Sequence, residues 1–342
     1  MRFSDSVYGE VFVPDVLKDI LNSHPMQRLK DVNLDTTSKY FSPFKLDSRF
    51  EHCLGAFHLS QFIPGDLNTF ELRLAALFHD IGAPPFTHIS DEFMLKIIGK
   101  DHESLAGETI LEFEDFFLKN NVSAKRISDY IVGKHLPGKL INSSIDIDNL
   151  DNLLRWAKGS GIIHSTPYDP VAILASMKIN NTTVIYSNSI EVDKWADFRH
   201  EVYNAVYDSP NLEISAMITK ALEIAMVNDA IKEEFFSMTE AEAITYLKNI
   251  PGAGKIMQML EQNNKFLRIV DIKSEKKQSI AVDDYLADLL PTQDYYLHSF
   301  KSKDVKEGIS NKYKSHYRIA LFVHPKHQKM KEKLGKKIEQ LL

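Results

Sequence analysis

One stretch of this 342-residue chain constrains the fold more than any other, the segment FELRLAALFHDIGAPPF at residues 70–86. Thr69 and Glu71 supply the start of a helix, and Gly82 followed by two prolines supplies its end, so that a helix is predicted over 68–82. Because this helix is apolar on nearly every side, it should lie in the centre of a core. His79 and Asp80 at its end would then be buried, which is costly unless a polar network or a metal ion compensates them.

Most of the remaining sequence also indicates helix. A capping-box pattern, Ser48 to Glu51, opens a helix over 48–63. Helical spacing of apolar residues predicts further helices at 102–119, 122–133, 144–158, 194–207, 211–230 and 238–249. Strand signals are few: an N-terminal hairpin in VYGEVFVP, a hairpin over 182–192 that turns at Ser187-Asn188, and strands at 266–272 and 315–324. We expect a mostly α fold with small β-hairpins.

Composition excludes several classes of protein. Hydrophobic residues make up 44% of the chain, yet no run of about 18 apolar residues occurs, so that no membrane span is expected. The N-terminus lacks the apolar stretch of a signal peptide. The single cysteine, Cys53, allows no internal disulfide, and we expect a cytoplasmic protein.

Charge is distributed unevenly along the chain. Residues 301–342 carry a net charge of +8, which leaves −14 on the first 300 residues because the whole chain carries −6. The basic C-terminus HPKHQKMKEKLGKKIEQLL could bind nucleic acid, although a solvated helix face is the favoured interpretation.

The segment PGAGK at 251–255 superficially resembles a phosphate-binding loop. The first glycine of that motif would fall on Asn249, and Ile256 follows Lys255 where the motif requires Ser or Thr. No strand signal precedes the segment. A helix start or a tight turn is the interpretation that we prefer.

Three separated segments contain residues that suit a metal site. SRFEHCLG contributes His52, the central segment contributes His79 and Asp80, and IDIDNLDNLLR contributes a row of aspartates. Imidazoles and carboxylates together are ligands for divalent metals. On a helix Asp148, Asp151 and Arg155 share one face, where the two carboxylates repel each other unless a cation or Arg155 offsets them.

Taken together, these motifs resemble the HD-domain phosphohydrolase superfamily, whose pattern is H…HD…D. More narrowly, they are similar to the dNTP triphosphohydrolase branch, which includes bacterial dGTPases and the vertebrate SAM-and-HD-domain dNTPase. The motifs occur in the order of that family: SDSVYGEVFVP, HPMQRLKDV, SRFEHCLG, ALFHDIGAPPFTH, DHE, IDIDNLDNLLR and DFRHEVYNAVYDSP. The resemblance covers residues 1–240 well and is thin beyond them.

The resemblance implies an HD-domain helical core with a small α+β C-terminal extension. The expected domains are an HD phosphohydrolase core over 1–175, a helical continuation of this core over 176–265, and the extension over 266–342 with a basic terminal helix. Members of the family usually form dimers or larger rings, so that a homo-oligomer is expected.

The resemblance also implies roles for individual residues. The metal ligands would be His52, His79, Asp80 and Asp148. Arg49 and His88 would bind phosphate, and His88, Asp91, His102 and Glu103 match positions that bind phosphate or assist proton transfer. The divalent metal could be Mn, Fe, Mg, Ni or Zn, because such a ligand set accepts each of them. The implied activity is metal-dependent hydrolysis of a nucleotide, most like the release of nucleoside and triphosphate from a dNTP.

The sequence departs from the family at positions that bear on substrate. Ala83 stands where many members carry a catalytic histidine, and Asn149, Asn152 and Trp156 replace residues that contact the nucleotide in the SAM-and-HD-domain enzyme. Alternatives therefore stay open: a phosphohydrolase of another phosphoester, such as a modified nucleotide, a nucleoside monophosphate or an oligonucleotide, or a catalytically weak nucleotide-sensing protein.

Overall fold

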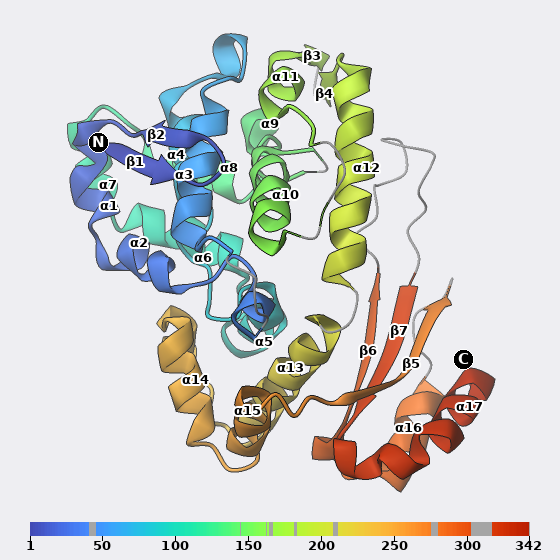
Figure 1. Cartoon of the computed structure of the whole chain (residues 1–342). Helices are drawn as coiled ribbons and strands as arrows, with labels where there is room; N and C mark the ends of the chain where they lie inside the picture. The colour runs from blue at the N-terminus through green and yellow to red at the C-terminus, as the bar shows by residue number, and fades with distance from the viewer. Residues whose placement is uncertain are drawn as a thin grey trace. The chain divides into compact units, whose positions relative to one another are not determined.

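The computed structural model describes residues 1–40, 46–143, 145–161, 163, 167–180, 183–207, 211–274, 280–301 and 317–341 (Figure 1). The chain divides into two compact units, one formed by residues 1–202 and 232–243 and the other by 203–231 and 244–342. No helix in the described ranges is both long and apolar enough to cross a membrane.

The first unit is helical with two small hairpins. Its helices are α1 (Lys18–Leu21), α2 (His24–Arg28), α3 (Arg49–Ser60), α4 (Phe70–Phe78), α5 (His88–Ile98), α6 (His102–Leu111), α7 (Glu114–Lys119), α8 (Ala124–Ile131), α9 (His135–Gly138), α10 (Ile147–Ser160), α11 (Pro170–Ala175) and most of α12 (Ser189–Val206). Its strands form two antiparallel pairs, β1 (Arg2–Asp5) with β2 (Gly9–Phe12) and β3 (Met177–Asn180) with β4 (Thr183–Tyr186).

The second unit is α+β. Its helices are α13 (Asn211–Val227), most of α14 (Glu240–Lys248), α15 (Ala253–Glu261), α16 (Ile280–Leu289) and α17 (Lys331–Leu341). Its strands, β5 (Leu267–Ser274), β6 (Tyr295–Lys301) and β7 (Tyr317–Val323), form an antiparallel sheet in the order β5-β7-β6. Leu321 and Val323 of β7 pack with Leu334 and Ile338 of α17 in one apolar cluster. The predicted mostly α fold with small hairpins and an α+β extension is therefore confirmed, whereas the domain boundaries at 175 and 265 stay a prediction.

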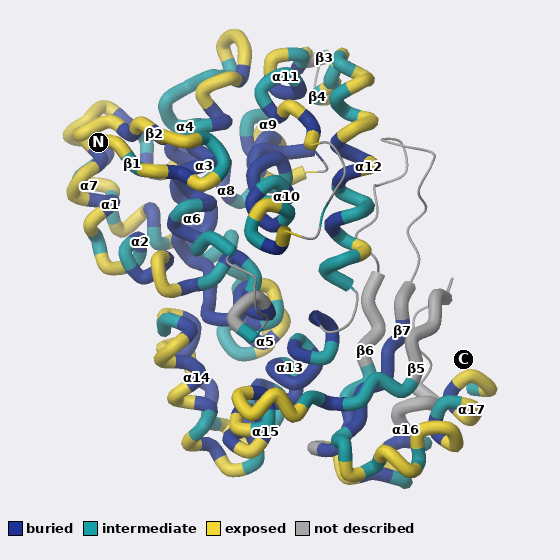
Figure 2. The backbone as a smooth tube through the Cα atoms, viewed as in Figure 1, coloured by how far each residue is buried: buried dark blue, intermediate teal, exposed yellow. Residues whose placement is uncertain are grey.

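Helix α3 lies at the centre of the first unit. It packs against α4, α10 and β2, and ten of its twelve residues are buried (Figure 2). Helix α4 is buried almost throughout after its first two residues, as its apolar sequence predicts. Residues on the inner faces and at the ends of these two helices are therefore screened from water. Charged residues are among them.

The predicted hairpin at 182–192 is wrong. The strand Thr183–Tyr186 pairs antiparallel with the preceding strand, Met177–Asn180, and not with the residues that follow it. A hydrogen bond from Ser187 N to Ser176 O, at 3.1 Å, extends this pairing. Asn188 begins a helix instead of a turn, because its side-chain oxygen accepts a hydrogen bond from Glu191 N. The segment predicted as a second strand is thus the first turn of α12. Thr182, also part of this prediction, lies outside the described residues.

Several predicted helices differ in their limits. The helix predicted over 102–119 is divided into α6 and α7, because Glu112 N and Phe113 N bond to the carbonyl oxygens three residues earlier and tighten the chain. The helix predicted over 68–82 ends at Phe78, after which Ile81 N and Ala83 N make bonds of the same kind. This early end turns His79 and Asp80 out of the regular helix.

Candidate metal centre

The first histidine of the site is positioned by a helix cap. Ser48 accepts a hydrogen bond from Phe50 N, and the Glu51 side chain accepts one from Ser48 N at 2.9 Å, so that the predicted capping box is present. The cap determines where α3 begins. Arg49 and His52 then lie one turn apart on the same side of the helix, where both are buried.

The His79-Asp80 pair sits where the chain leaves α4. His79 Nδ1 donates to Ala76 O at 2.9 Å, which orients the ring. Two residues further on, the chain passes close to the backbone of α6. A Cβ on Gly82 would lie 2.5 Å from Ala106 N and 2.6 Å from His102 O. Glycine is therefore required at this position of the HDIG segment.

The third part of the site is the first turn of α10. Asp146 caps this helix and accepts a hydrogen bond from Asn149 N at 2.7 Å. Asp148 follows in the first turn, with a side chain that is 33% exposed but directed to His52. Asp151 and Arg155 continue the same face, as the sequence predicts, and both are fully buried.

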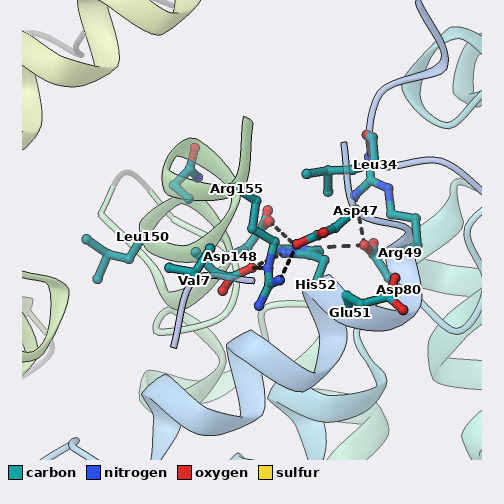
Figure 3. Close-up of polar contacts among 12 residues, drawn as sticks. Val7, Leu34, Asp47, Arg49, Glu51, His52, Asp80, Asp148, Leu150 and Arg155 are labelled. Atoms are coloured by element: carbon teal, nitrogen blue, oxygen red, sulfur yellow. Dashed lines mark hydrogen bonds and ion pairs between the residues drawn. The ribbon is translucent and has the colours of Figure 1, made fainter. Parts of the chain in front are cut away.

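The four predicted metal ligands lie close to one another, and Figure 3 labels three of them, His52, Asp80 and Asp148. His52 Nε2 and His79 Nε2 are 3.2 Å apart. Asp80 Oδ2 lies 3.7 Å from His52 Nε2 and 3.6 Å from His79 Nε2. Asp148 Oδ1 lies 3.0 Å from His52 Nε2 and 3.9 Å from His79 Nε2. Ligand atoms of His52, His79 and Asp80 thus all lie within 4.8 Å of one another, and Asp148 Oδ1 lies beside the two histidines.

The hydrogen bonds of the two histidines show what this point requires. Both Nδ1 atoms face acceptors, Asp151 Oδ2 at 2.6 Å and Ala76 O at 2.9 Å, so that both must carry the ring proton. A neutral ring then presents the lone pair of Nε2. A cation bound here would replace any Nε2 proton and accept lone pairs from both imidazoles and both carboxylates, although Asp80 Oδ2 also accepts a hydrogen bond from Arg49 Nη1 at 2.8 Å.

A divalent cation fits this arrangement. Bonds of about 2.1 Å place neighbouring ligand atoms roughly 3.0–3.5 Å apart, close to the separations found here. Asp148 Oδ1 is buried and has no hydrogen bond of acceptable geometry, which is the state of an oxygen prepared for a metal. The pKa of His52 is consistent with this excess of negative charge: burial alone would lower it, but Asp148 and Asp151 raise it to about 9.

A buried ionic network lies behind His52. The Asp151 carboxylate accepts from His52 Nδ1 and from Arg155 Nε, each at 2.6 Å. The other two nitrogens of this guanidinium donate to Asp47 Oδ2 at 2.6 Å and Asp5 Oδ2 at 2.7 Å. Such partners of a metal-ligating histidine orient the ring and make it a stronger ligand. The i,i+4 spacing indicated the Asp151–Arg155 pair, but no sequence signal connected Asp5 or Asp47 with the site.

The network also explains a glycine in α3. A Cβ at Gly55 would lie 2.0 Å from Asp151 Oδ1 and 2.1 Å from Arg155 Nη2. We expect Gly55→Ala to destabilise the protein by about 1–3 kcal/mol or more, because overpacking would separate these groups. Urea unfolding checks this. Gly335→Ala in α17 is the matched control, since its nearest contact would be 3.9 Å away, and a stabilisation of about 0.5–1 kcal/mol is expected there. Equal effects of the two substitutions would contradict the steric explanation.

Arg49 connects the metal cluster with a second cluster of residues. Its Nη1 donates to Asp80 Oδ2 at 2.8 Å, and its Nη2 donates to Leu34 O at 3.2 Å. The same Nη2 lies 3.5 Å from His88 Nε2. The predicted phosphate-binding pair, Arg49 and His88, is therefore adjacent in space, and Arg49 also neutralises a metal-ligand carboxylate.

The second cluster is built around Asp91. Its carboxylate accepts from His88 Nδ1 at 3.2 Å and from His102 Nδ1 at 2.7 Å. Burial would raise the pKa of Asp91, but the two histidines lower it. Burial would likewise lower the pKa of His102, which Asp91 raises to about 9. Glu103 lies beside this group; burial raises its pKa, and it accepts a hydrogen bond from Asn142. The structure thus brings the four predicted proton-transfer candidates together.

The backbone before His88 is strained. Phe86 and Thr87 have φ values of 64° and 48°, which residues with a Cβ seldom adopt. Such conformations cost about 1–3 kcal/mol each and persist where the surrounding structure imposes them. Here they begin α5 so that half-exposed His88 faces Arg49.

The positions that depart from the family pattern take part in other contacts. Ala83 is buried, and its carbonyl oxygen accepts from Arg28 at 2.7 Å. Asn149 Nδ2 donates to Asp146, and Trp156 Nε1 donates to Asp35 Oδ2 at 2.9 Å. The side chains that would contact a nucleotide in the family are thus replaced by groups that bond within the protein.

Comparison with known proteins defines the class. Residues 49–156 match the family model described as the HD domain. This range contains all four candidate ligands and the Asp151–Arg155 pair. Residues 49–156 thus form an HD domain, as the sequence motifs predict.

Two curated relatives show how far the similarity extends. An uncharacterized protein of Methanocaldococcus jannaschii is 27% identical over 277 residues, covering 78% of this chain and 58% of the relative. A Dictyostelium discoideum protein named as a deoxynucleoside triphosphate triphosphohydrolase SAMHD1 homolog is 24% identical over 295 residues, covering 78% of this chain and 53% of the relative. The chain thus spans little more than half the length of these relatives.

A solved structure shows the same fold. A crystal structure of a phosphohydrolase from Bacteroides thetaiotaomicron superposes with a TM-score of 0.72 at 16% identity, covering 95% of this chain and 99% of the other. The similarity in fold therefore extends over residues of both units.

Proposed function

We propose that this protein is a metal-dependent phosphohydrolase of nucleotides, most like a dNTP triphosphohydrolase. The observation that carries the proposal is the cluster of His52, His79 and Asp80 inside an HD domain, with Asp148 beside the two histidines. The name of the Dictyostelium relative supports the substrate class, and that of the Bacteroides structure supports phosphoester hydrolysis.

In this proposal the four ligands hold one divalent cation, which when bound polarises a phosphoryl oxygen and lowers the pKa of the attacking water. Arg49 and His88, 3.5 Å apart, bind the substrate phosphate and stabilise the charge that develops on it. Arg49 is held ready for this by Asp80 and by Leu34 O.

The residues around Asp91 would carry out the proton transfers of the reaction. His88 donates its Nδ1 proton to Asp91, which leaves Nε2 as the atom that exchanges protons with substrate. His102, with its raised pKa, keeps a positive charge beside the same carboxylate at neutral pH. A doubly protonated His88 would supply its Nε2 proton to the leaving oxygen and become neutral, with its Nδ1 proton still hydrogen-bonded to Asp91, and Glu103 is a further acceptor close to His102. These groups would perform the proton transfer for which the family uses a histidine at the position of Ala83.

Product analysis tests the proposal. The full chain, loaded with Mn²⁺, is incubated separately with each dNTP, NTP and dNMP, beside Asp148→Ala as the inactive control. We expect nucleoside and triphosphate from at least one dNTP with the wild-type protein and neither product with the control. Products that are equal in both proteins would contradict the role of the metal centre.

A second candidate is favoured by the contacts of Trp156 and Asn149. Because these side chains bond to Asp35 and Asp146, the contacts that read sugar and base in the family are missing at these two positions. The alternative substrates are another phosphoester, such as a modified nucleotide, a nucleoside monophosphate or an oligonucleotide. Inorganic phosphate released from a dNMP in the same assay, or a shorter product when an oligonucleotide or a modified nucleotide is added as substrate, would favour this candidate. Metal binding without turnover on any substrate would instead favour the nucleotide-sensing alternative.

We also propose that the protein forms a homo-oligomer, as the family resemblance implies, and that it is cytoplasmic, as its single cysteine indicates. Light scattering after size-exclusion chromatography would give the mass. A monomer at all concentrations would contradict the proposed assembly.

A further inference from the structure

The second unit contains a cavity of about 600 Å³ that the proposed reaction does not use. Helices α13 and α15 form two of its walls, and the short helical turns at Thr292–Asp294 and Pro325–Met330 contribute to the rest. All of its lining residues belong to this one unit. A volume of this size suits a small organic molecule, because ligand pockets commonly have roughly 300–1,000 Å³.

The cavity lining carries more positive than negative charge. Lys220 is paired with Glu223, and Lys326 is paired with Asp294 at 2.6 Å. Lys255 is exposed and has no hydrogen bond or ion pair within the described part of the chain. The two carboxylates are thus neutralised by their own lysines, and the ammonium group of Lys255 remains available to a ligand.

Apolar side chains form another part of the lining. Val227 is 81% exposed, and Ile224, Ile256 and Met259 line the cavity beside it. Exposure of this valine to water is unfavourable, and its free-energy cost is proportional to the apolar surface area left uncovered. An inorganic ion would cover none of this surface, whereas an organic molecule would cover it.

The segment PGAGK shapes the side of the cavity nearest Lys255. Gly252, with φ 85°, begins α15, and a Cβ there would lie 3.1 Å from Ile224 Cγ2. No side chain caps this helix, so that its N-terminal partial positive charge adds to that of Lys255. The segment does begin a helix, as the sequence predicts, and it brings its lysine to the cavity.

We propose that this cavity binds a small phosphate monoester with an apolar body. The ammonium group of Lys255 contacts the phosphate, and Val227, Ile224 and Met259 cover the apolar part. Lys326 and Lys220 offset the charges of Asp294 and Glu223, so that these carboxylates do not repel the phosphate. This site is separate from the metal centre, since all of its lining residues lie in the other unit.

Lysine footprinting with phenyl phosphate as the probe tests this proposal. The full chain is treated with EDTA to leave the metal centre empty and is then acetylated with and without the probe. Mass spectrometry gives the extent of labelling at each lysine. We expect labelling of Lys255 and Lys326 to fall several-fold, while Lys119, an exposed lysine in α7, does not change. Lys255→Gln, a surface substitution that folding should tolerate, should abolish the protection of Lys326, and Lys119→Gln should not.

The other outcomes would overturn the proposal. Equal protection of Lys119, or no protection of Lys255, would show that phenyl phosphate does not bind here. Protection by neutral phenol alone would show that no phosphate is recognised, and equal protection by inorganic phosphate would show that the apolar surface plays no part. Persistence of Lys326 protection in Lys255→Gln would remove Lys255 from the site.

Discussion

Asp80→Ala is expected to lose both the metal and several kcal/mol of folding stability, whereas Asp148→Ala should lose the metal alone. Both carboxylates face the two histidines, but only Asp80 also pairs with buried Arg49, at 2.8 Å. Removing a partner from a buried ion pair costs about 3–5 kcal/mol. Asp148 has a partly exposed side chain and no arginine partner among its described contacts.

Metal content and urea unfolding, measured on the same preparations, check this prediction. Each alanine variant should also lose catalysis by roughly a thousandfold, because several kcal/mol of transition-state stabilisation depend on the metal. Asp66→Ala, at an exposed position of the same unit, is the control and should change neither quantity. Retention of the metal by Asp148→Ala would exclude Asp148 as a ligand. An equal loss of stability in the Asp80 and Asp148 variants would refute the role given to Arg49.

Asp151→Asn is expected to weaken metal binding by about 10–100-fold although Asp151 does not face the metal position. Its carboxylate holds the Nδ1 proton of His52 and so presents the Nε2 lone pair. Asparagine keeps the volume but removes the charge that makes the ring a stronger ligand. Metal titration followed by calorimetry gives the affinity, and unfolding under metal-free conditions gives the stability separately.

Asp47→Asn is the matched control for this effect. Asp47 contacts the same Arg155 guanidinium, at 2.6 Å, but does not contact His52. Both variants should lose some stability, since each removes a carboxylate that balances the charge of the buried Arg155 guanidinium. Only Asp151→Asn should lose metal affinity. A similar loss of affinity in both variants would show that the network acts on the whole site through folding and not through the His52 ring.

Local sequence signals account for much of the candidate site. The capping box at Ser48 starts α3 where it was expected, and Thr69 with an apolar run produces the buried α4. These signals involve neighbours in the chain, so that they can be read without a tertiary structure. The family motifs added the order of the ligands. The residues that these motifs name as ligands lie close together in the structure, and their roles as metal ligands stay proposals.

Other parts of the fold were not predictable in this way. Asn188 can serve a hairpin turn or a helix cap, and the pairing of Thr183–Tyr186 with Met177–Asn180 decided between them. Strand β6 and helix α5 were not predicted. The strained residues before α5 gave no sequence warning, because Phe and Thr rarely adopt positive φ.

The sequence by itself determined the class of the fold, the HD domain and the residues that could hold a metal, because caps, periodicity and motif order are properties of short segments. Only the tertiary structure decided that Asp151 orients His52, that Asp5 and Asp47 neutralise Arg155, and that Arg49 joins Asp80 to His88. These contacts join residues up to 150 positions apart. They exist because burying a charge requires a partner, and which partner is in reach depends on how the helices pack.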